Sequence, residues 1–299
     1  MMSDTQNRSK KGLFSFFLIT LYIAAFSMLL YFLISGFDYY ASPLTDHPHH
    51  ELYKDLKPGG FRSHGFGILG SIMLILLLLY SVRKRMRMFQ RLGPLSQWLN
   101  LHIFFGVTGP LFIILHSTLK LNGLVAVSFW SMVAVALSGI LGRYLYLQIP
   151  RNIIGQELSL HEVVELNQNL MNQLTKNFQM DLPEIQKVES LFLISPQQEQ
   201  NIIKSLFHLI TGDVRFFLKS RKIKKQMRTH YQISTTQMQT FFGLLKQRAL
   251  ISRRINLWNK IHQLFHYWHV FHKPFALVMY IIMVIHIGIV IWLGYRWIF

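Results

Sequence analysis

Residues 98–117 read WLNLHIFFGVTGPLFIILHS, and residues 272–286 read HKPFALVMYIIMVIH. Both stretches suit helices inside a bilayer, because about 20 apolar residues at about 1.5 Å rise cross a hydrocarbon core of about 30 Å. Each stretch also holds two histidines that stand fourteen residues apart. Fourteen steps of about 100° end within about 40° of the start, so each pair is predicted to share one helix face, about 21 Å apart along the axis.

The rest of the chain has the composition of a membrane protein. Of its 299 residues, 51% are hydrophobic and 15% are charged. This composition predicts an all-α integral membrane protein with about five transmembrane helices. The first span is too long for a signal-peptide core and no small-residue cleavage site follows it, so it is expected to be a retained anchor. The expected spans are residues 13–37, 65–82, 98–119, 124–149 and 275–295.

A long polar stretch between the fourth and fifth spans predicts a helical cytoplasmic insertion. Ser159 and Glu162 match a capping box, and Ser195 with Pro196 matches a second helix start. Residues 215–228 hold seven Lys or Arg residues, which favours attraction to anionic membrane lipid over docking of an acidic redox partner. The expected organisation is residues 1–149 with four membrane helices, 150–265 as the insertion, and 266–299 with the fifth membrane helix.

Charges around the spans predict the orientation. Basic residues precede the first span and fill the loop between the second and third, whereas the loop between the first and second is mixed. Because cytoplasmic loops carry the excess of Lys and Arg, the N-terminus is expected in the cytoplasm and the C-terminus outside, in a bacterial-type inner membrane. The same bias accounts for the formal net charge of +18 without nucleic acid as a partner.

The lack of Cys in the chain, and of Asp and Glu in two long stretches, excludes or disfavours several classes of function. The chain has no Cys, which excludes disulfides, thiolate nucleophiles, Cys-ligated iron–sulfur clusters and covalent c-type haem. It has no Asp or Glu from Leu56 to Gln156 and none after Asp213. Proton- or cation-coupled transporters usually need carboxylates inside the membrane, so a transporter is disfavoured.

The four spaced histidines carry the prediction of function. The third and fifth spans are expected to run in the same direction, so His102 can face His272 near the cytoplasm and His116 can face His286 near the outside. A six-coordinate haem iron takes one neutral imidazole on each side of the porphyrin. The two pairs therefore predict axial ligation of two haem b groups in a haem-binding helix bundle. The alternative is that these histidines only hydrogen-bond between helices.

Other residues are candidates for secondary roles around the haems. Gly106 and Gly109 share a face with the histidines of the third span and are predicted to leave room for a flat macrocycle, although small residues otherwise serve close helix packing. Arg143 and Lys273 are candidates for neutralising haem propionates, with snorkelling at the interface weighed equally. Arg62 is a weaker candidate for the outer haem.

Other histidines give weaker signals. The group before the fifth span shares one helix face, which favours an amphipathic interface, with quinone or metal binding as the alternative. Its member His269 is also an alternative inner ligand, and His64 is a candidate for shaping an outer quinone pocket. A group in the first loop is expected to be solvated, with a surface metal site as the alternative. The two groups are His262, His266 and His269, and His47, His49 and His50.

The arrangement of His102 and His116 with His272 and His286 resembles the ferric reductase-like transmembrane core, which the membrane domain of NADPH oxidases shares, and more loosely the cytochrome b561 group. In that core, two helices each carry two haem-ligating histidines about one bilayer depth apart. The resemblance covers the second to fifth spans without the insertion and implies a diheme b cytochrome. Those reductases commonly append flavin and nicotinamide domains. Here no G-x-G-x-x-G follows a strand, no P-loop occurs and nothing follows the last span, so this chain is expected not to take hydride itself.

Three functions stay open at this point. The first is a cytochrome subunit of an oxidoreductase that links a quinone pool to a separate iron–sulfur, flavin or cytochrome c protein. The second is direct reduction of an external acceptor such as ferric iron. The third, from another class, is a haem-free membrane scaffold or transporter.

Overall fold

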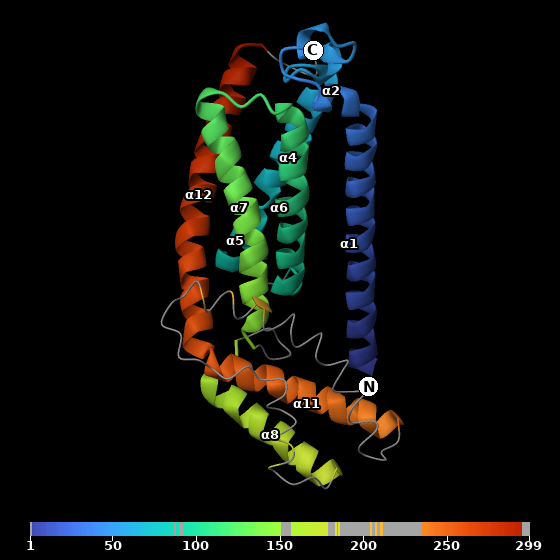
Figure 1. The fold of residues 1–299 in the computed structure, drawn as a ribbon, viewed down its shortest axis with the longest axis vertical. Coiled ribbons are helices and arrows are strands. Elements are labelled where there is room, and N and C mark those ends of the chain that lie inside the picture. Colours follow the sequence, from blue (N-terminus) through green and yellow to red (C-terminus); the bar gives the residue numbers. More distant parts are fainter. Residues whose placement is uncertain are drawn as a thin grey trace. The chain divides into compact units, whose positions relative to one another are not determined.

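The computed structural model of the chain describes residues 2–86, 88–89, 92–150, 157–178, 183, 185, 204, 207, 210–211 and 235–294. The described elements are helices (Figure 1). Five helical stretches are long and apolar enough to cross a membrane, which confirms the predicted all-α membrane protein. The membrane helices are α1 (Met2–Ser35), α4 (Phe61–Leu76) with α5 (Leu78–Arg85), α6 (Leu95–Ser117), α7 (Gly123–Gln148) and α12 (Trp258–Trp292).

The last membrane helix is longer than predicted. α12 begins at Trp258, well before the expected start of the fifth span, and it continues through Pro274. A proline removes one backbone hydrogen bond, and membrane helices tolerate this loss where neighbouring groups satisfy the freed carbonyl. The histidines of the group before the fifth span therefore lie on the same helix as His272 and His286.

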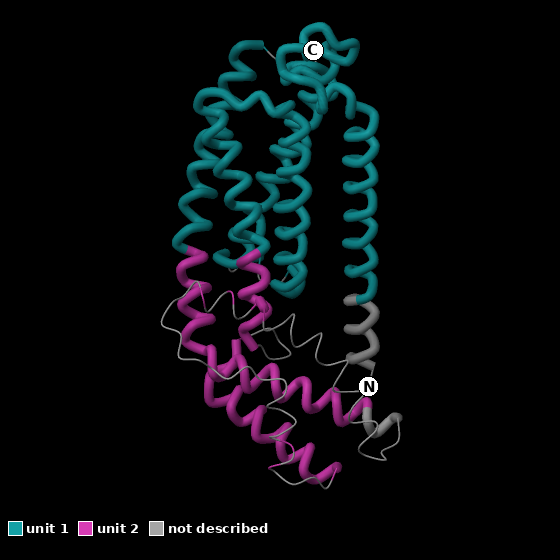
Figure 2. Tube along the Cα trace, in the orientation of Figure 1, with its two compact units in different colours: residues 1–140, 270–299 teal, residues 141–269 magenta. Residues whose placement is uncertain are grey.

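The chain divides into two compact units (Figure 2). The first unit comprises residues 1–140 and 270–299, and the second comprises residues 141–269. The boundary passes through α7 and α12, so the second unit contains the predicted insertion together with the adjoining ends of both helices.

In the first unit, α4 and α6 pack against each other along most of their length. Two glycines allow this close approach. A Cβ atom on Gly70 would meet the Ile113 side chain at 2.7 Å and the Gly109 carbonyl oxygen at 3.1 Å, and a Cβ on Gly109 would meet the Cβ of Met73 at 3.2 Å. The glycines thus bring the two backbones into direct contact, as small residues do between membrane helices.

α1 joins this pair through aromatic side chains. The ring of Tyr22 meets Phe104 of α6 edge-on at 4.9 Å, and Phe32 meets Phe66 of α4 at the same centroid distance. Edge-to-face pairs at these distances are favourable. Most of the α1 surface is exposed in the protein, as expected for a helix that faces lipid.

The loop between α1 and α4 folds into three short helices: α2 (Phe37–Ala41), the 3₁₀ helix η1 (His47–His49) and α3 (Tyr53–Leu56). The expectation that the histidines of this loop are solvated is wrong for His47, which is 6% exposed. Its ring stacks on the buried ring of Tyr39 at 4.1 Å, and its Nε2 lies 3.2 Å from the Ser42 carbonyl oxygen. Stacking against an aromatic ring and a carbonyl partner make the burial favourable.

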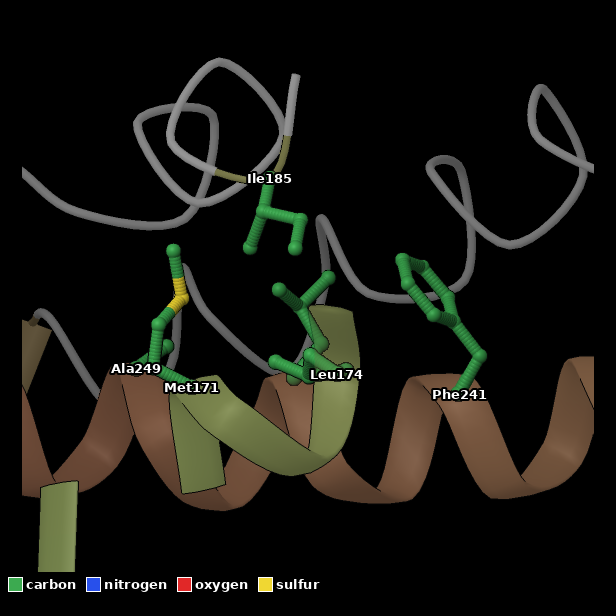
Figure 3. Packing of buried hydrophobic residues seen from close by; sticks show 6 residues of the cluster. Met171, Leu174, Ile185, Phe241 and Ala249 are labelled. Atoms are coloured by element: carbon green, nitrogen blue, oxygen red, sulfur yellow. The ribbon is translucent and has the colours of Figure 1, made fainter. Parts of the chain in front are cut away.

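The second unit contains α8 (Leu160–Phe178) and α11 (Thr235–Asn256), which pack together. Figure 3 shows side chains from both helices meeting in a small apolar core with Ile185. The predicted capping box is confirmed: the Ser159 backbone N–H donates to the Glu162 carboxylate at 2.7 Å, and the Glu162 N–H donates to the Ser159 hydroxyl at 3.3 Å. The labelled core residues are Met171, Leu174, Ile185, Phe241 and Ala249.

Two predicted features lie outside the described residues. They are the helix start at Ser195 and Pro196, and the basic stretch 215–228.

Candidate functional site

All four spaced histidines lie in the first unit. His102 and His116 are on α6, and His272 and His286 are on α12. Each of the four side chains is partly buried in the protein. Each ring therefore contacts other protein groups, and a contact at one ring nitrogen determines whether the other nitrogen can bind a metal.

His116 is clamped by Ser63 on α4. The His116 Nδ1 atom lies 2.8 Å from the Ser63 carbonyl oxygen, and the Ser63 hydroxyl donates to the His116 carbonyl oxygen at 2.8 Å. The ring rests on Gly67, where a Cβ atom would come within 2.8–3.0 Å of three of its atoms. The fully buried Ser63 and the bare backbone of Gly67 fix both the height and the plane of the imidazole.

His102 is held in a similar way at the other end of α6. Its Nδ1 atom lies 3.1 Å from the carbonyl oxygen of Leu77, the residue that joins α4 to α5. Its ring lies 5.2 Å from the ring of Tyr80, measured between centroids. An apolar pocket borders the imidazole and is lined by Leu76, Leu79, Tyr80, Trp98, Leu101, His102 and Phe105.

The two anchors of the α6 histidines repeat the spacing of the histidines themselves. Ser63 and Leu77 are fourteen residues apart, as are His102 and His116, and the pairs run in opposite directions. Gly70 lies midway between the anchors and contacts the Gly109 carbonyl, and Gly109 lies midway between the two histidines. The antiparallel helix pair therefore holds both rings of α6 at two levels through backbone atoms.

The α4–α6 contact bears on the predicted role of Gly106 and Gly109, which is to leave room for a macrocycle. Gly109 faces Met73 and Leu74, and the nearest side-chain atom to a Cβ on Gly106 would belong to Leu77, at 3.6 Å. Both glycines thus face α4 and its junction with α5. This placement favours the alternative prediction, in which the glycines allow close helix packing. Clearance for a macrocycle by these residues stays a prediction.

On α12, His272 is anchored by a side chain of α7. Its Nδ1 atom lies 2.7 Å from the hydroxyl oxygen of Ser138. The neighbouring His262 and His269 behave differently, because their Nδ1 atoms lie 2.8 and 2.9 Å from carbonyl oxygens of their own helix, at Trp258 and Phe265. His272 thus has an oxygen partner at Nδ1 on another helix, as His102 and His116 have.

His286 lies at the same end of the first unit as the Ser63–His116 clamp. His116, His286 and His64 lie close enough for protonated imidazoles at these positions to repel one another. The predicted partners His116 and His286 are thus near each other, and His64 is a third imidazole near them.

Between the two histidine levels, one face of α12 packs into apolar side chains, whereas Leu277, Ile281 and Val284 on the remainder of the helix are exposed. Met279 and Met283 join a cluster with residues of α4 and α7. Two hydrogen bonds fasten the helix there: the Tyr280 hydroxyl donates to the Leu74 carbonyl oxygen at 2.5 Å, and the Ser128 hydroxyl donates to the Met279 carbonyl oxygen at 3.1 Å. The other buried members of the cluster are Leu74, Leu77, Phe129 and Met132.

These contacts determine which nitrogen can bind a metal. A carbonyl oxygen only accepts hydrogen bonds, so in the neutral rings of His102 and His116 the proton lies on Nδ1 and the lone pair on Nε2. A metal-bound histidine typically has this arrangement, because the second nitrogen donates to an oxygen that fixes the tautomer. The donor set fits a haem iron, which needs two protein ligands. Among the described residues, no group of three or more His, Cys, Asp or Glu could hold a metal ion.

Two of the three charged candidates have contacts of their own. The guanidinium carbon of Arg143, in the second unit, lies 5.6 Å from the centroid of the Tyr146 ring, a cation–π contact. Arg62 pairs with Asp55 at 3.6 Å, and Lys273 is exposed. Neutralisation of haem propionates by any of these residues stays a prediction.

The three histidines before the fifth span do not form one cluster of contacts in the described structure. The His262 Nε2 atom lies 2.6 Å from a Glu157 carboxylate oxygen, whereas His266 is exposed. His262 and His269 each also contact a carbonyl oxygen of their own helix at Nδ1. This fits the amphipathic interpretation of the surface, while quinone binding stays a prediction.

The residues that hold the rings were not predicted from the sequence. Ser63, Gly67, Leu77 and Ser138 carry no charge and belong to no metal-binding motif, so the histidine spacing alone does not reveal them. One signal was available: Ser63 and Leu77 repeat the spacing of fourteen. The sequence matches no family model, and it matches neither a curated protein nor a solved structure.

Proposed function

We propose that this protein carries electrons across a membrane through two b-type haems, with His102 and His272 as ligands of one and His116 and His286 as ligands of the other. The observation that supports this most is the cross-helix anchoring of three imidazoles at Nδ1. Such anchoring leaves Nε2 for an iron. The two rings of α6 are moreover held at levels about 21 Å apart along the helix axis, by anchors with the same spacing.

A bound haem supplies the one-electron couple between ferric and ferrous iron. The chain supplies orientation, ligand basicity and exclusion of water. The oxygen partners of the imidazoles orient the rings and raise their basicity. The apolar cluster around Met279 and Met283 separates the two histidine levels with side chains that carry no charge, so ions are kept from the path between them.

The proposed orientation places the Leu77–His102 level toward the cytoplasm. Arg83, Lys84 and Arg85 end α5 at this level, whereas the loop of α2 and α3 at the other end is mixed in charge. The bias of Lys and Arg toward cytoplasmic loops supports this choice. Electrons would then be exchanged with a quinone pool or a partner redox protein, because the described residues form no domain for a nicotinamide or flavin.

A reduced-minus-oxidised spectrum of the purified protein, with pyridine-haemochrome quantitation, tests this proposal. We expect about two b haems per chain. His102→Ala and His286→Ala should each leave about one. His269→Ala is the matched control, because this histidine is on α12 but bonds to its own helix, and it should keep both haems.

A well-folded sample from haem-replete cells that contains no haem would overturn the proposal. Retention of both haems after all four ligands are replaced would overturn the assignment of the site. Loss of a haem in His269→Ala, with retention in His272→Ala, would transfer the ligand role to His269.

A further inference from the structure

The contacts of Ser138 determine the direction of its hydrogen bonds. Its hydroxyl oxygen lies 2.8 Å from the Val135 carbonyl oxygen, one turn back on α7, and 2.7 Å from the His272 Nδ1 atom. A hydroxyl has one proton, and a carbonyl oxygen cannot donate. With its proton donated to the Val135 carbonyl, the Ser138 oxygen accepts a hydrogen bond from the Nδ1–H of His272. The lone pair of the His272 ring is then on Nε2.

The chemical nature of this anchor differs from the other two. His102 and His116 donate to main-chain carbonyl oxygens, which no substitution removes. His272 donates to a side-chain hydroxyl, which a single substitution can remove. This hydrogen bond thus depends on the side chain of a single residue, Ser138.

We infer that Ser138 is a positioning residue that fixes the tautomer of His272 and sets the reduction potential of the His102–His272 haem site; this rests on the proposed function. A hydrogen bond from Nδ1–H makes the imidazole more basic. A more basic ligand favours ferric over ferrous iron, so the Ser138 contact lowers the potential of this site. The other proposed site is bound by His116 and His286, about 21 Å further along the helices, and should keep its potential.

The test is a redox titration of Ser138→Ala beside the native protein. We expect one of the two midpoint potentials to rise and the other to stay, and the haem affinity of the shifted site to fall by about 10–100-fold. Ser138→Thr keeps a hydroxyl and should restore the native potential. Ser128→Ala is the matched control, because it removes another α7 hydroxyl that bonds to α12, at the Met279 carbonyl oxygen and not at an imidazole.

Two unchanged potentials in Ser138→Ala, with native haem content, would overturn the inference. So would a shift that Ser138→Thr fails to reverse, because that result indicates a packing effect. If the native protein holds no haem, the proposed function fails separately. The ring can then be examined by nitrogen-15 NMR of labelled histidine in haem-free protein, where an Nε2–H tautomer of His272 in the native chain would overturn the role of Ser138.

Discussion

The two histidine-bearing helices are held by opposite means. α6 lies against α4, with glycines at the crossing and main-chain carbonyls as partners of its imidazoles. α12 is fastened by side-chain hydroxyls, those of Tyr280, Ser128 and Ser138. Among the described helices, the backbones of α7 and α12 approach no neighbour over as long a stretch as the backbones of α4 and α6 approach each other.

This difference indicates how each helix responds to change. Contacts made by backbone atoms survive most substitutions but cannot accept added volume, because the backbones have no room to separate. Contacts made by hydroxyls disappear with one atom but leave space for adjustment. α6 should therefore be sensitive to larger residues, and α12 to the loss of polar ones.

The largest effect is expected from Gly67→Ala. Its Cβ would lie 2.8–3.0 Å from atoms of the His116 ring, so the imidazole must move. The number of haems per chain, measured by pyridine haemochrome, should fall from about two to about one. Gly288→Ala is the matched control, since nothing lies within 4 Å of its Cβ although it is two residues from His286. Equal haem content in both variants would show that the α4 contact does not hold the ring.

Gly109→Ala tests the crossing of α4 and α6. The new Cβ would meet the Met73 Cβ at 3.2 Å, and that atom cannot move without its backbone. Overpacking of this kind costs about 1–3 kcal/mol, so thermal unfolding in detergent should begin at a lower temperature. The control is Gly139→Ala on α7, which has open space and should be neutral or slightly stabilising. Equal melting of the two variants would contradict the comparison.

A smaller effect is expected from Tyr280→Phe, which removes the bond from α12 to the Leu74 carbonyl. A hydrogen bond contributes about 0.5–1.5 kcal/mol net, so the loss should be modest and should appear as lower thermal stability. Tyr267→Phe, at an exposed position of the same helix, should change nothing. A Tyr280→Phe variant as stable as the native chain would mean that the apolar cluster alone holds α12.

The most local effect concerns the second unit. Ser159→Ala removes an N-cap of α8 and should cost about 1 kcal/mol without altering haem content. Hydrogen bonds from the Ser159 backbone and side chain lower the pKa of Glu162. A depressed folded-state pKa means that this contribution is present above the ordinary pKa of a glutamate and is lost as pH falls through the depressed value. Helix content of the native chain should follow this acid dependence, and Glu162→Gln should weaken it.

Tyr40 gives a corresponding dependence at alkaline pH. Its hydroxyl donates to the Leu115 carbonyl at 3.4 Å, and burial, more than the nearby Tyr39, raises its pKa to about 12. A raised folded-state pKa means that the contribution is full below the ordinary pKa of tyrosine and declines as pH rises toward 12. Ultraviolet titration of the phenolates should show one late-titrating tyrosine fewer in Tyr40→Phe than in the native chain.

The sequence predicted the membrane helices well, since length and apolar composition depend on the chain alone. Each of the five expected spans overlaps one of the five helical stretches that are long and apolar enough to cross a membrane, and the capping box at Ser159 forms. The start of α12 was missed because Pro274 and the amphipathic histidines before it resemble a boundary. The burial of His47 was missed because its partner, Tyr39, is eight residues away and meets it only once the loop is folded.

In the candidate site, too, local features could be predicted from the sequence, whereas contacts between helices could not. Spacing by itself determined that His102 and His116 share a face of α6 and that His272 and His286 share a face of α12, because helix periodicity is a local property. Only the tertiary structure decided what each ring meets: a serine carbonyl, a carbonyl at a helix junction, or a hydroxyl on α7. The reason is physical, since hydrogen-bond partners on other helices depend on which helices pack together, and periodicity along one helix carries no information about its neighbour.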